Sequence, residues 1–304
     1  MNIMYVMFKT LGDVIVSTTI VKELRKEYPG AKIHFFTNKP YGDLLRNNPD
    51  IESVIESEAW LLDSVFLEMS SGKYDKIFLP YQVRRECNIW HQEEETRYQH
   101  LVDFYWNRMG MHRLITEREC YLYPSEQDYA KAADMVSFDL PRIAIHSTTG
   151  VATKDWPYFE EFVETMRLLG YGSLQVGAPT DKKIKGAIDF RGKMSFLELA
   201  AFLSKCSAFV GLDSGVSYIA DAMKTPTIVI QGSTNPTTSG PISSRVVHLF
   251  AKETGYPDCQ VVRCHQNCRH EVNCITHIKV KDVIDALDKI ADENKWVTPL
   301  PVMV

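Results

Sequence analysis

Mostly apolar stretches and amphipathic segments alternate along this chain. Apolar residues dominate 3–8, 31–37, 142–146, 208–212 and 227–231. Short stretches with little polar alternation predict strands buried on both faces of a sheet. Apolar residues at helical spacing over 14–28, 158–169, 216–223 and 280–294 predict helices between them. This alternation predicts an α/β fold in which helices cover parallel sheets.

Weaker patterns complete the expected order of elements. We expect further strands near residue 54 and over 76–79 and 173–176, and helices over 41–47, 58–70, 98–109, 124–140, 180–187 and 196–205. The series runs twice, with the change near residues 136–141. A chain of 304 residues with 45% hydrophobic content can bury two cores. We therefore predict two Rossmann-like domains, 1–138 and 139–285, followed by a helix end and tail over 286–304.

Charge and targeting signals narrow the class of protein. The net charge of −5 gives no general attraction to nucleic acid or anionic lipid. Residues 1–6 lead directly into Lys9 and Asp13, unlike a signal peptide, and no apolar run approaches membrane-spanning length. These features predict a cytosolic protein.

The segment 209–218 carries the clearest sign of ligand chemistry. An apolar strand reaches Gly211, and the small-residue turn Asp213-Ser214-Gly215 leads into a helix expected from Val216. Free amides at a helix start that follows a buried strand bind anions, phosphate above all. The alternative is that Asp213 and Ser214 only cap the helix.

Several motifs in fixed order resemble those of glycosyltransferase family nine, the bacterial heptosyltransferases. They are Leu11-Gly12-Asp13-Val14, the Asn-Pro-Asp-Ile at 48–51, Lys154-Asp155-Trp156-Pro157, the Gly-Leu-Asp-Ser-Gly at 211–215 and the Gly-Ser-Thr-Asn-Pro at 232–236. The resemblance implies the GT-B architecture, two Rossmann-like domains with parallel sheets facing across a cleft. In that architecture the first domain binds the acceptor, the second binds the nucleotide sugar, and the C-terminal tail packs back on the first. Tyr218 departs from the histidine usual in the family, which changes how the donor is held.

The resemblance also implies two catalytic residues. Asp13 becomes the general base that deprotonates the acceptor hydroxyl in an inverting transfer. The alternative for Asp13 is an N-cap of the helix 14–28. Lys154 becomes the cation that neutralises the departing diphosphate, against the alternative of a solvated surface lysine.

By the same resemblance, the remaining site residues divide between donor and acceptor. Met194 lies against the nucleobase, Asp181 binds the ribose hydroxyls, and Asp213 binds hydroxyls of the transferred sugar. A core methionine and a helix cap are the alternatives for Met194 and Asp181. The full expected donor set is Thr148, Thr149, Asp181, Met194, Asp213, Ser214, Gly215 and Tyr218, and the expected acceptor set is Gly12, Arg84 and Arg85.

Two other groups have simpler interpretations. The long segment around Arg84 and Arg85 also fits a solvated surface, and the aromatic stretch 98–109, with Tyr105 and Trp106, fits core packing. The chain has seven cysteines, and four of them, Cys259, Cys264, Cys268 and Cys274, lie within sixteen residues. Four thiolates can close a structural zinc or iron site, as in the related heptosyltransferases that modify autotransporter proteins. Free thiols or a reversible disulfide are the alternatives.

Together these features predict an inverting, metal-independent glycosyltransferase of lipopolysaccharide biosynthesis. The expected donor is a nucleotide diphosphate sugar, ADP-heptose first, and the expected acceptor is a glycan or glycolipid hydroxyl, ahead of a protein or nucleic acid. Catalysis requires no cofactor, and peripheral contact with the inner membrane fits such an acceptor. The alternatives are a sugar-nucleotide epimerase or hydrolase on the same scaffold, and a non-catalytic protein that binds a nucleotide sugar or a metal.

Overall fold

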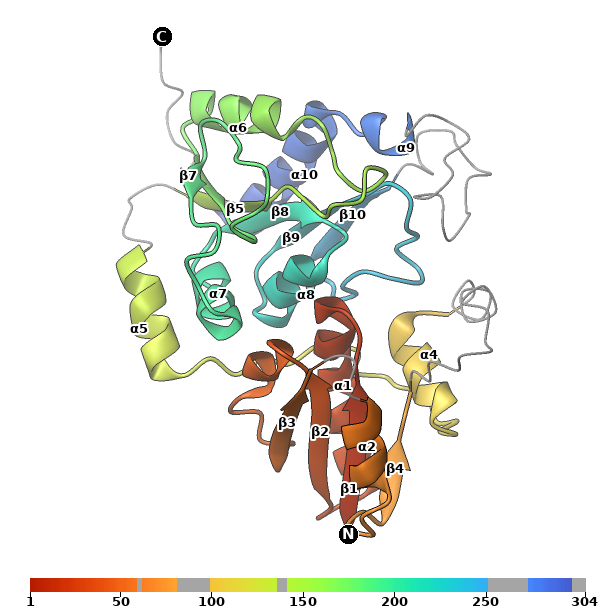
Figure 1. Cartoon of the computed structure of the whole chain (residues 1–304). Helices are drawn as coiled ribbons and strands as arrows, with labels where there is room; N and C mark the ends of the chain where they lie inside the picture. The colour runs from red at the N-terminus through yellow and green to blue at the C-terminus, as the bar shows by residue number, and fades with distance from the viewer. Residues whose placement is uncertain (59–61, 81–98, 136–140, 251–272, 297–304) are drawn as a thin grey trace. The chain divides into compact units, whose positions relative to one another are not determined.

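The computed structural model describes residues 1–58, 62–80, 99–135, 141–250 and 273–296 (Figure 1). Contacts divide the chain into two compact units, Met1–Glu126 and Gln127–Val304. The division falls ahead of residue 138, where the sequence pattern changes. In the described residues no helix combines the length and apolar character needed to cross a membrane.

The first unit is built on a four-stranded parallel sheet. Its strands are β1 (Asn2–Met7), β2 (Lys32–Asn38), β3 (Ser53–Ser57) and β4 (Lys76–Phe78), in the order β3-β2-β1-β4. β1 pairs with β2 on one side and β4 on the other, with Tyr5 opposite both Phe35 and Phe78. The buried residues 3–7 therefore form the central strand, as the apolar pattern predicts.

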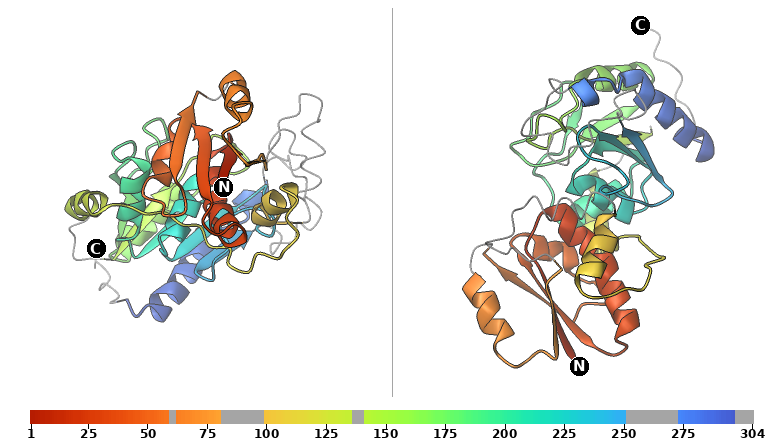
Figure 2. Two further views of the ribbon diagram at one scale, coloured as in Figure 1. Left: turned by 90° about the horizontal axis from the view of Figure 1, so that it is seen from below. Right: turned by 90° about the vertical axis from the view of Figure 1, so that its right-hand side faces the viewer.

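Helices cover both faces of this sheet. Its helical elements are α1 (Leu11–Glu27), the 3₁₀ helix η1 (Tyr41–Leu45), α2 (Leu62–Met69) and α4 (Leu101–Arg108). α2 packs Val65 against Met4 and Val6 on one face, whereas Tyr5, which points the other way, contacts Ser17 of α1. Figure 2 shows α1 and α4 together on the face opposite α2. The period-two alternation along β1 thus separates two apolar layers.

The second unit has a six-stranded parallel sheet in the order β10-β9-β8-β5-β6-β7. Its strands are β5 (Arg142–His146), β6 (Gly172–Gln175), β7 (Ile188–Asp189), β8 (Ala208–Leu212), β9 (Thr227–Gln231) and β10 (Val246–Phe250). Its helices are α5 (Glu126–Met135, whose first residue still belongs to the first unit), α6 (Phe159–Leu168), α7 (Phe196–Leu203), α8 (Gly215–Ala222), α9 (Asn273–Thr276) and α10 (Val280–Glu293). The bounds predicted for β5, β8 and β9 are confirmed.

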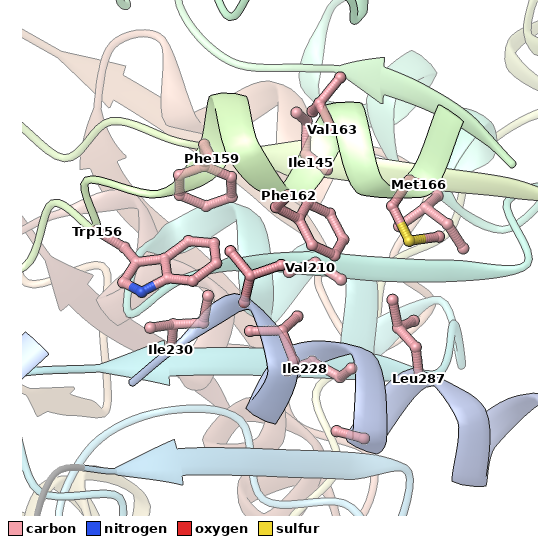
Figure 3. Packing of buried hydrophobic residues seen from close by; sticks show 14 of the residues in the cluster. Ile145, Trp156, Phe159, Phe162, Val163, Met166, Val210, Ile228, Ile230 and Leu287 are labelled. Atoms are coloured by element: carbon pink, nitrogen blue, oxygen red, sulfur yellow. The ribbon is translucent and has the colours of Figure 1, made fainter. Parts of the chain in front are cut away.

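One core of this unit lies between the sheet and the helices α6 and α10. Figure 3 shows Trp156, Phe159, Phe162 and Leu287 packed against the central strands. The Trp156 indole donates to the Ile278 carbonyl oxygen at 2.7 Å, so its buried N–H is satisfied. Trp156 thereby fixes the end of the loop that follows β5.

Both sheets reverse their strand order at one place. In the first unit the chain moves from β1 outward to β3 and then crosses to β4 on the other side of β1. In the second it moves from β5 to β7 and then crosses to β8 on the other side of β5. Open parallel sheets bind ligands beyond the carboxyl ends of the strands at such switch points. The loops after β1, β5 and β8 are therefore the places to look for a site.

Three details of the predicted pattern differ from the structure. The helix expected over 180–187 is wrong: the segment is a series of turns leading to β7, and the Asp181 carboxylate accepts from the Ala178 amide. The strands β7 and β10 and the short helix α9 were not expected. β10 is an edge strand of half-buried residues, so its pattern lacks the apolar contrast of the central strands.

Candidate active site

Asp13 lies at the switch point of the first sheet, in the first turn of α1. Helix α1 begins at Leu11 with Thr10 as its N-cap, so Asp13 is not the N-cap residue. Its Oδ2 accepts hydrogen bonds from the Thr10 amide at 3.1 Å and the Thr10 hydroxyl at 2.6 Å. A carboxylate in the first helical turn also lies at the positive end of the helix dipole. The site therefore presents an oriented, 6% exposed carboxylate.

The second oxygen of Asp13 faces α4. The buried Tyr105 hydroxyl donates to Asp13 Oδ1, and Lys9 Nζ lies 3.7 Å from the same oxygen. On β1, the Tyr5 hydroxyl donates to the Ser17 hydroxyl of α1, and burial raises the pKa of Tyr5 well above its usual range. The aromatic stretch is core, as its composition predicts, but one of its members also reaches the candidate base.

Lys154 and Asp213 meet at the switch point of the second sheet. Lys154 follows β5, Asp213 follows β8, and the two strands are neighbours. Lys154 Nζ lies 2.8 Å from Asp213 Oδ2, and the side chains are 22% and 8% exposed. Two residues 59 positions apart in sequence thus form a largely buried ion pair at the edge where a ligand is expected.

The loop that carries Lys154 is held by its own polar groups. The Thr149 amide and hydroxyl both donate to Asp155 Oδ1 at 2.7 Å, and the Lys154 amide donates to the Val151 carbonyl oxygen at 2.8 Å. Thr153 contacts Ser233 of the loop after β9, hydroxyl to hydroxyl at 3.0 Å. Thr148 is half-buried beside Thr149. These contacts fix the conformation of the loop and hold it against the loop after β9.

His146, the last residue of β5, links two further candidates. Its Nδ1 lies 3.0 Å from the Ser214 hydroxyl, and its Nε2 lies 3.5 Å from Asp181 Oδ2. A hydrogen on Nε2, toward the carboxylate, leaves Nδ1 to accept from Ser214. Ser214 is the N-cap residue of α8 by position, yet within the described residues its hydroxyl does not cap the helix.

A glycine permits this arrangement. Gly177 has φ of +137°, and a Cβ there would lie 2.1 Å from Asp181 Oδ2 and 3.0 Å from the His146 ring. Such a contact forbids any larger residue without displacing both side chains. The structure therefore brings Asp181, His146 and Ser214 together at the carboxyl ends of β5, β6 and β8.

Tyr218 points into the second unit and contacts a neighbouring loop. It is 5% exposed, and its hydroxyl accepts from the Gly240 amide at 2.6 Å. His248 of β10 holds the same loop, with Nε2 2.9 Å from the Pro241 carbonyl oxygen and Nδ1 2.5 Å from Gln231 Oε1. Burial lowers the pKa of His248 against weaker opposing effects of its hydrogen bond to the Pro241 carbonyl oxygen and of Asp213.

The remaining predicted residues are placed as follows. Met194 is half-buried just before Ser195, the N-cap of α7, so it is not a fully buried core methionine. Gly215 is the first residue of α8, and Gly12 is the second residue of α1. Arg84 and Arg85 lie outside the described residues.

The cysteine cluster is only partly described. Cys274 is buried on α9, whereas Cys259, Cys264 and Cys268 lie outside the described residues. Among the residues that are described, no group of three or more His, Cys, Asp or Glu side chains could hold a metal ion. The prediction of a zinc or iron site therefore stays a prediction.

Two parallel α/β units with polar side chains gathered at each switch point have the organisation of a nucleotide-sugar glycosyltransferase. The model of glycosyltransferase family 9 (heptosyltransferase) matches residues 71–270. The chain belongs to glycosyltransferase family 9, so the predicted family and fold class are confirmed, and the protein is a glycosyltransferase.

Individual relatives agree with this assignment. Lipopolysaccharide heptosyltransferase 3 of Escherichia coli is 21% identical over 342 residues, covering 95% of this chain and 99% of the relative. The solved structure of Escherichia coli ADP-heptose lipopolysaccharide heptosyltransferase II superposes with a TM-score of 0.74 at 15% identity, covering 97% of this chain and 100% of that one. The iron-containing dodecameric glycosyltransferase TibC of enterotoxigenic Escherichia coli gives 0.69 at 15% identity, covering 96% and 76%. At these identities the two structures show the fold alone.

Two residues of the site were not expected from the sequence. Tyr105 lies in an aromatic stretch that fits core packing, and His146 is the last residue of a buried strand. The sequence around neither residue therefore indicates a site. A usable signal for His146 was its place two residues before Thr148, the first of the expected donor residues in sequence order. For Tyr105 no local signal exists, because its partner is 92 positions away.

Proposed function

We propose that this chain is an inverting heptosyltransferase that transfers heptose from ADP-heptose to a hydroxyl of a lipopolysaccharide-type acceptor. Family membership supports sugar transfer, and the donor and the acceptor class are supported by the relatives, an ADP-heptose lipopolysaccharide heptosyltransferase among them. The observation that carries the proposal is the Lys154–Asp213 pair beside the start of α8, at the switch point of the second sheet.

The donor diphosphate is assigned to this switch point. The Lys154 ammonium supplies a positive charge, and the first amides of α8, with that of Thr148, supply hydrogen-bond donors. Thr149 contributes by fixing the loop that carries Lys154, since its amide and hydroxyl both donate to Asp155 Oδ1. These groups neutralise the charge that develops on the departing diphosphate without a metal ion. Because Asp213 already pairs with Lys154, it holds the ammonium in place and offers its other oxygen to a sugar hydroxyl.

The remaining contacts with the nucleotide sugar are assigned from where the residues lie in the second unit. Asp181 lies beyond β6 with one oxygen on the Ala178 amide, so its second oxygen serves the ribose hydroxyls. Met194, half-buried before α7, lies against the adenine. Tyr218 anchors the loop at Gly240, whose amide donates to its hydroxyl, and shapes the donor site through that loop.

Asp13 is proposed as the general base. Its carboxylate takes the proton of the acceptor hydroxyl while that oxygen attacks the anomeric carbon from the face opposite the diphosphate. A single displacement of this kind inverts the anomeric configuration. Gly12, Arg84 and Arg85 are the residues proposed to meet the acceptor.

A transfer assay tests this proposal. Purified protein is incubated with ADP-heptose and a lipopolysaccharide acceptor that lacks heptose, and the product is analysed by mass spectrometry and NMR. We expect an added heptose of inverted configuration, and an unchanged rate after chelator treatment. Donor consumed equally without acceptor would indicate a hydrolase or epimerase instead, and titration showing no binding of ADP, UDP, GDP or dTDP sugars would indicate another function.

A further inference from the structure

The contact between Tyr105 and Asp13 joins two distant parts of the first unit. Tyr105 belongs to α4, its side chain is fully buried, and its hydroxyl donates to Asp13 Oδ1. A buried phenol must find a polar partner, because an unmade hydrogen bond in the interior is costly. Here that partner is the carboxylate at the switch point of the sheet.

The two oxygens of Asp13 are held from different sides. Thr10 donates twice to Oδ2, from the loop after β1. Tyr105 donates to Oδ1, from α4. With each oxygen bound from a separate element, rotation of the carboxylate about its last bond is prevented. A general base needs this fixed direction, since proton transfer depends on alignment with the attacking hydroxyl.

We propose that Tyr105 is a positioning residue for the catalytic base: its hydroxyl fixes the Asp13 carboxylate so that one lone pair of Oδ1 or Oδ2 stays directed at the acceptor. This inference rests on the proposed function, because it gives Asp13 the role of base. A phenylalanine at position 105 fills the same apolar space. The special contribution of tyrosine is therefore its polar contacts.

A cation and a phenol lie beside Asp13 Oδ1. Among the described residues, Lys9 faces it from the loop after β1 and Tyr105 from α4, whereas the Tyr5 hydroxyl on β1 is bonded to Ser17. Lys9 Nζ also lies 3.5 Å from the Tyr105 hydroxyl, so the three groups form one cluster. Loss of the Tyr105 hydroxyl removes one member of this cluster and leaves Oδ1 without the donor from α4.

The test compares Tyr105→Phe with Tyr5→Phe. Tyr5 is a matched control, because its side chain is also fully buried and its hydroxyl donates to Ser17 at 2.9 Å, not to the carboxylate. Ser17 lies on α1, the helix that carries Asp13. We expect Tyr105→Phe to lower kcat about tenfold or more, with little change in the donor KM. Tyr5→Phe loses some stability but keeps both kcat and the donor KM.

A double-mutant cycle separates this inference from the proposed function. In an Asp13→Asn background, Tyr105→Phe should lower turnover no further, because the group it positions has lost its role. An unchanged kcat in a folded Tyr105→Phe, with turnover still abolished by Asp13→Asn, would overturn the positioning role alone. Normal turnover of Asp13→Asn would overturn both.

A second variant protects the test if Tyr105→Phe does not fold. Thr10 is exposed, so Thr10→Ala should fold while it removes the hydroxyl donor to Oδ2. We expect a loss of kcat with the donor KM unchanged, smaller than in Tyr105→Phe because the Thr10 amide still holds that oxygen. A kcat equal to that of the unmodified protein would contradict the proposal that donors to this carboxylate orient the base.

Discussion

Replacement of Lys154 by methionine separates the structural and catalytic contributions of the second switch point. The variant keeps the length of the side chain and removes its charge. It leaves Asp213, which is 8% exposed, without its 2.8 Å partner. We expect three effects: lower stability, weaker donor binding and a much lower kcat.

The structure sets the size of each effect. At 2.8 Å and an effective dielectric constant of about 20, the Coulomb attraction of the pair is about 6 kcal/mol. Desolvation offsets most of this energy, and Lys154 is 22% exposed, so the expected loss in the free energy of unfolding is about 2 kcal/mol. Loss of a charge-assisted contact to the diphosphate should raise the Kd of ADP about tenfold or more. Loss of charge stabilisation at the leaving group should lower kcat by about 10² to 10³.

The double variant Lys154→Met with Asp213→Asn distinguishes these effects. The asparagine removes the unpaired buried charge, so chemical denaturation should show most of the lost stability restored. Calorimetric titration with ADP and a transfer assay should show that binding and kcat stay low. Recovery of donor affinity and turnover together with stability would refute the reasoning, since Lys154 would then be only the partner of Asp213.

Two further predictions concern the loop beside α8. Tyr218→Phe removes the 2.6 Å acceptor of the buried Gly240 amide. Thermal unfolding should therefore reveal a loss of about 1–3 kcal/mol in the free energy of unfolding, and titration should show a weaker affinity for ADP. Unchanged values for both would contradict an anchoring role. Burial lowers the pKa of His248 below its usual 6.5, so the unfolded chain binds the proton more readily. Stability should therefore fall as pH drops below about 6.5. Denaturation curves of His248→Gln should show a smaller decline in stability over the same pH range. An equal decline would assign the effect to other groups.

The sequence predicts the central elements well because burial makes their pattern strong. The strands β5, β8 and β9 are buried on both faces, so nearly every residue is apolar and their bounds follow directly. The turns at 177–187 show the opposite case. There the structure depends on Gly177 at positive φ and on the Asp181 side chain, and the apolar spacing suggested a helix.

The candidate site was predictable where its residues follow strands. Lys154 and Asp213 lie in loops that a parallel sheet brings to its switch point, and Asp13 lies in the first turn of the helix that follows β1. The motif order pointed to all three. Their partners were not predictable, because each pairing joins distant positions. The Tyr105 ring looks like core from sequence, and it is core, but the direction of its hydroxyl depends on how α4 packs against α1.

The central claim, that the Asp13 carboxylate is the base of a sugar transfer, is tested most directly by the turnover of Asp13→Asn with ADP-heptose and a heptose-deficient acceptor. The amide keeps the shape of the side chain but cannot take the proton. We predict a loss of about 10² or more in kcat, with the Kd of ADP unchanged. A kcat within a few-fold of the unmodified protein would contradict the account.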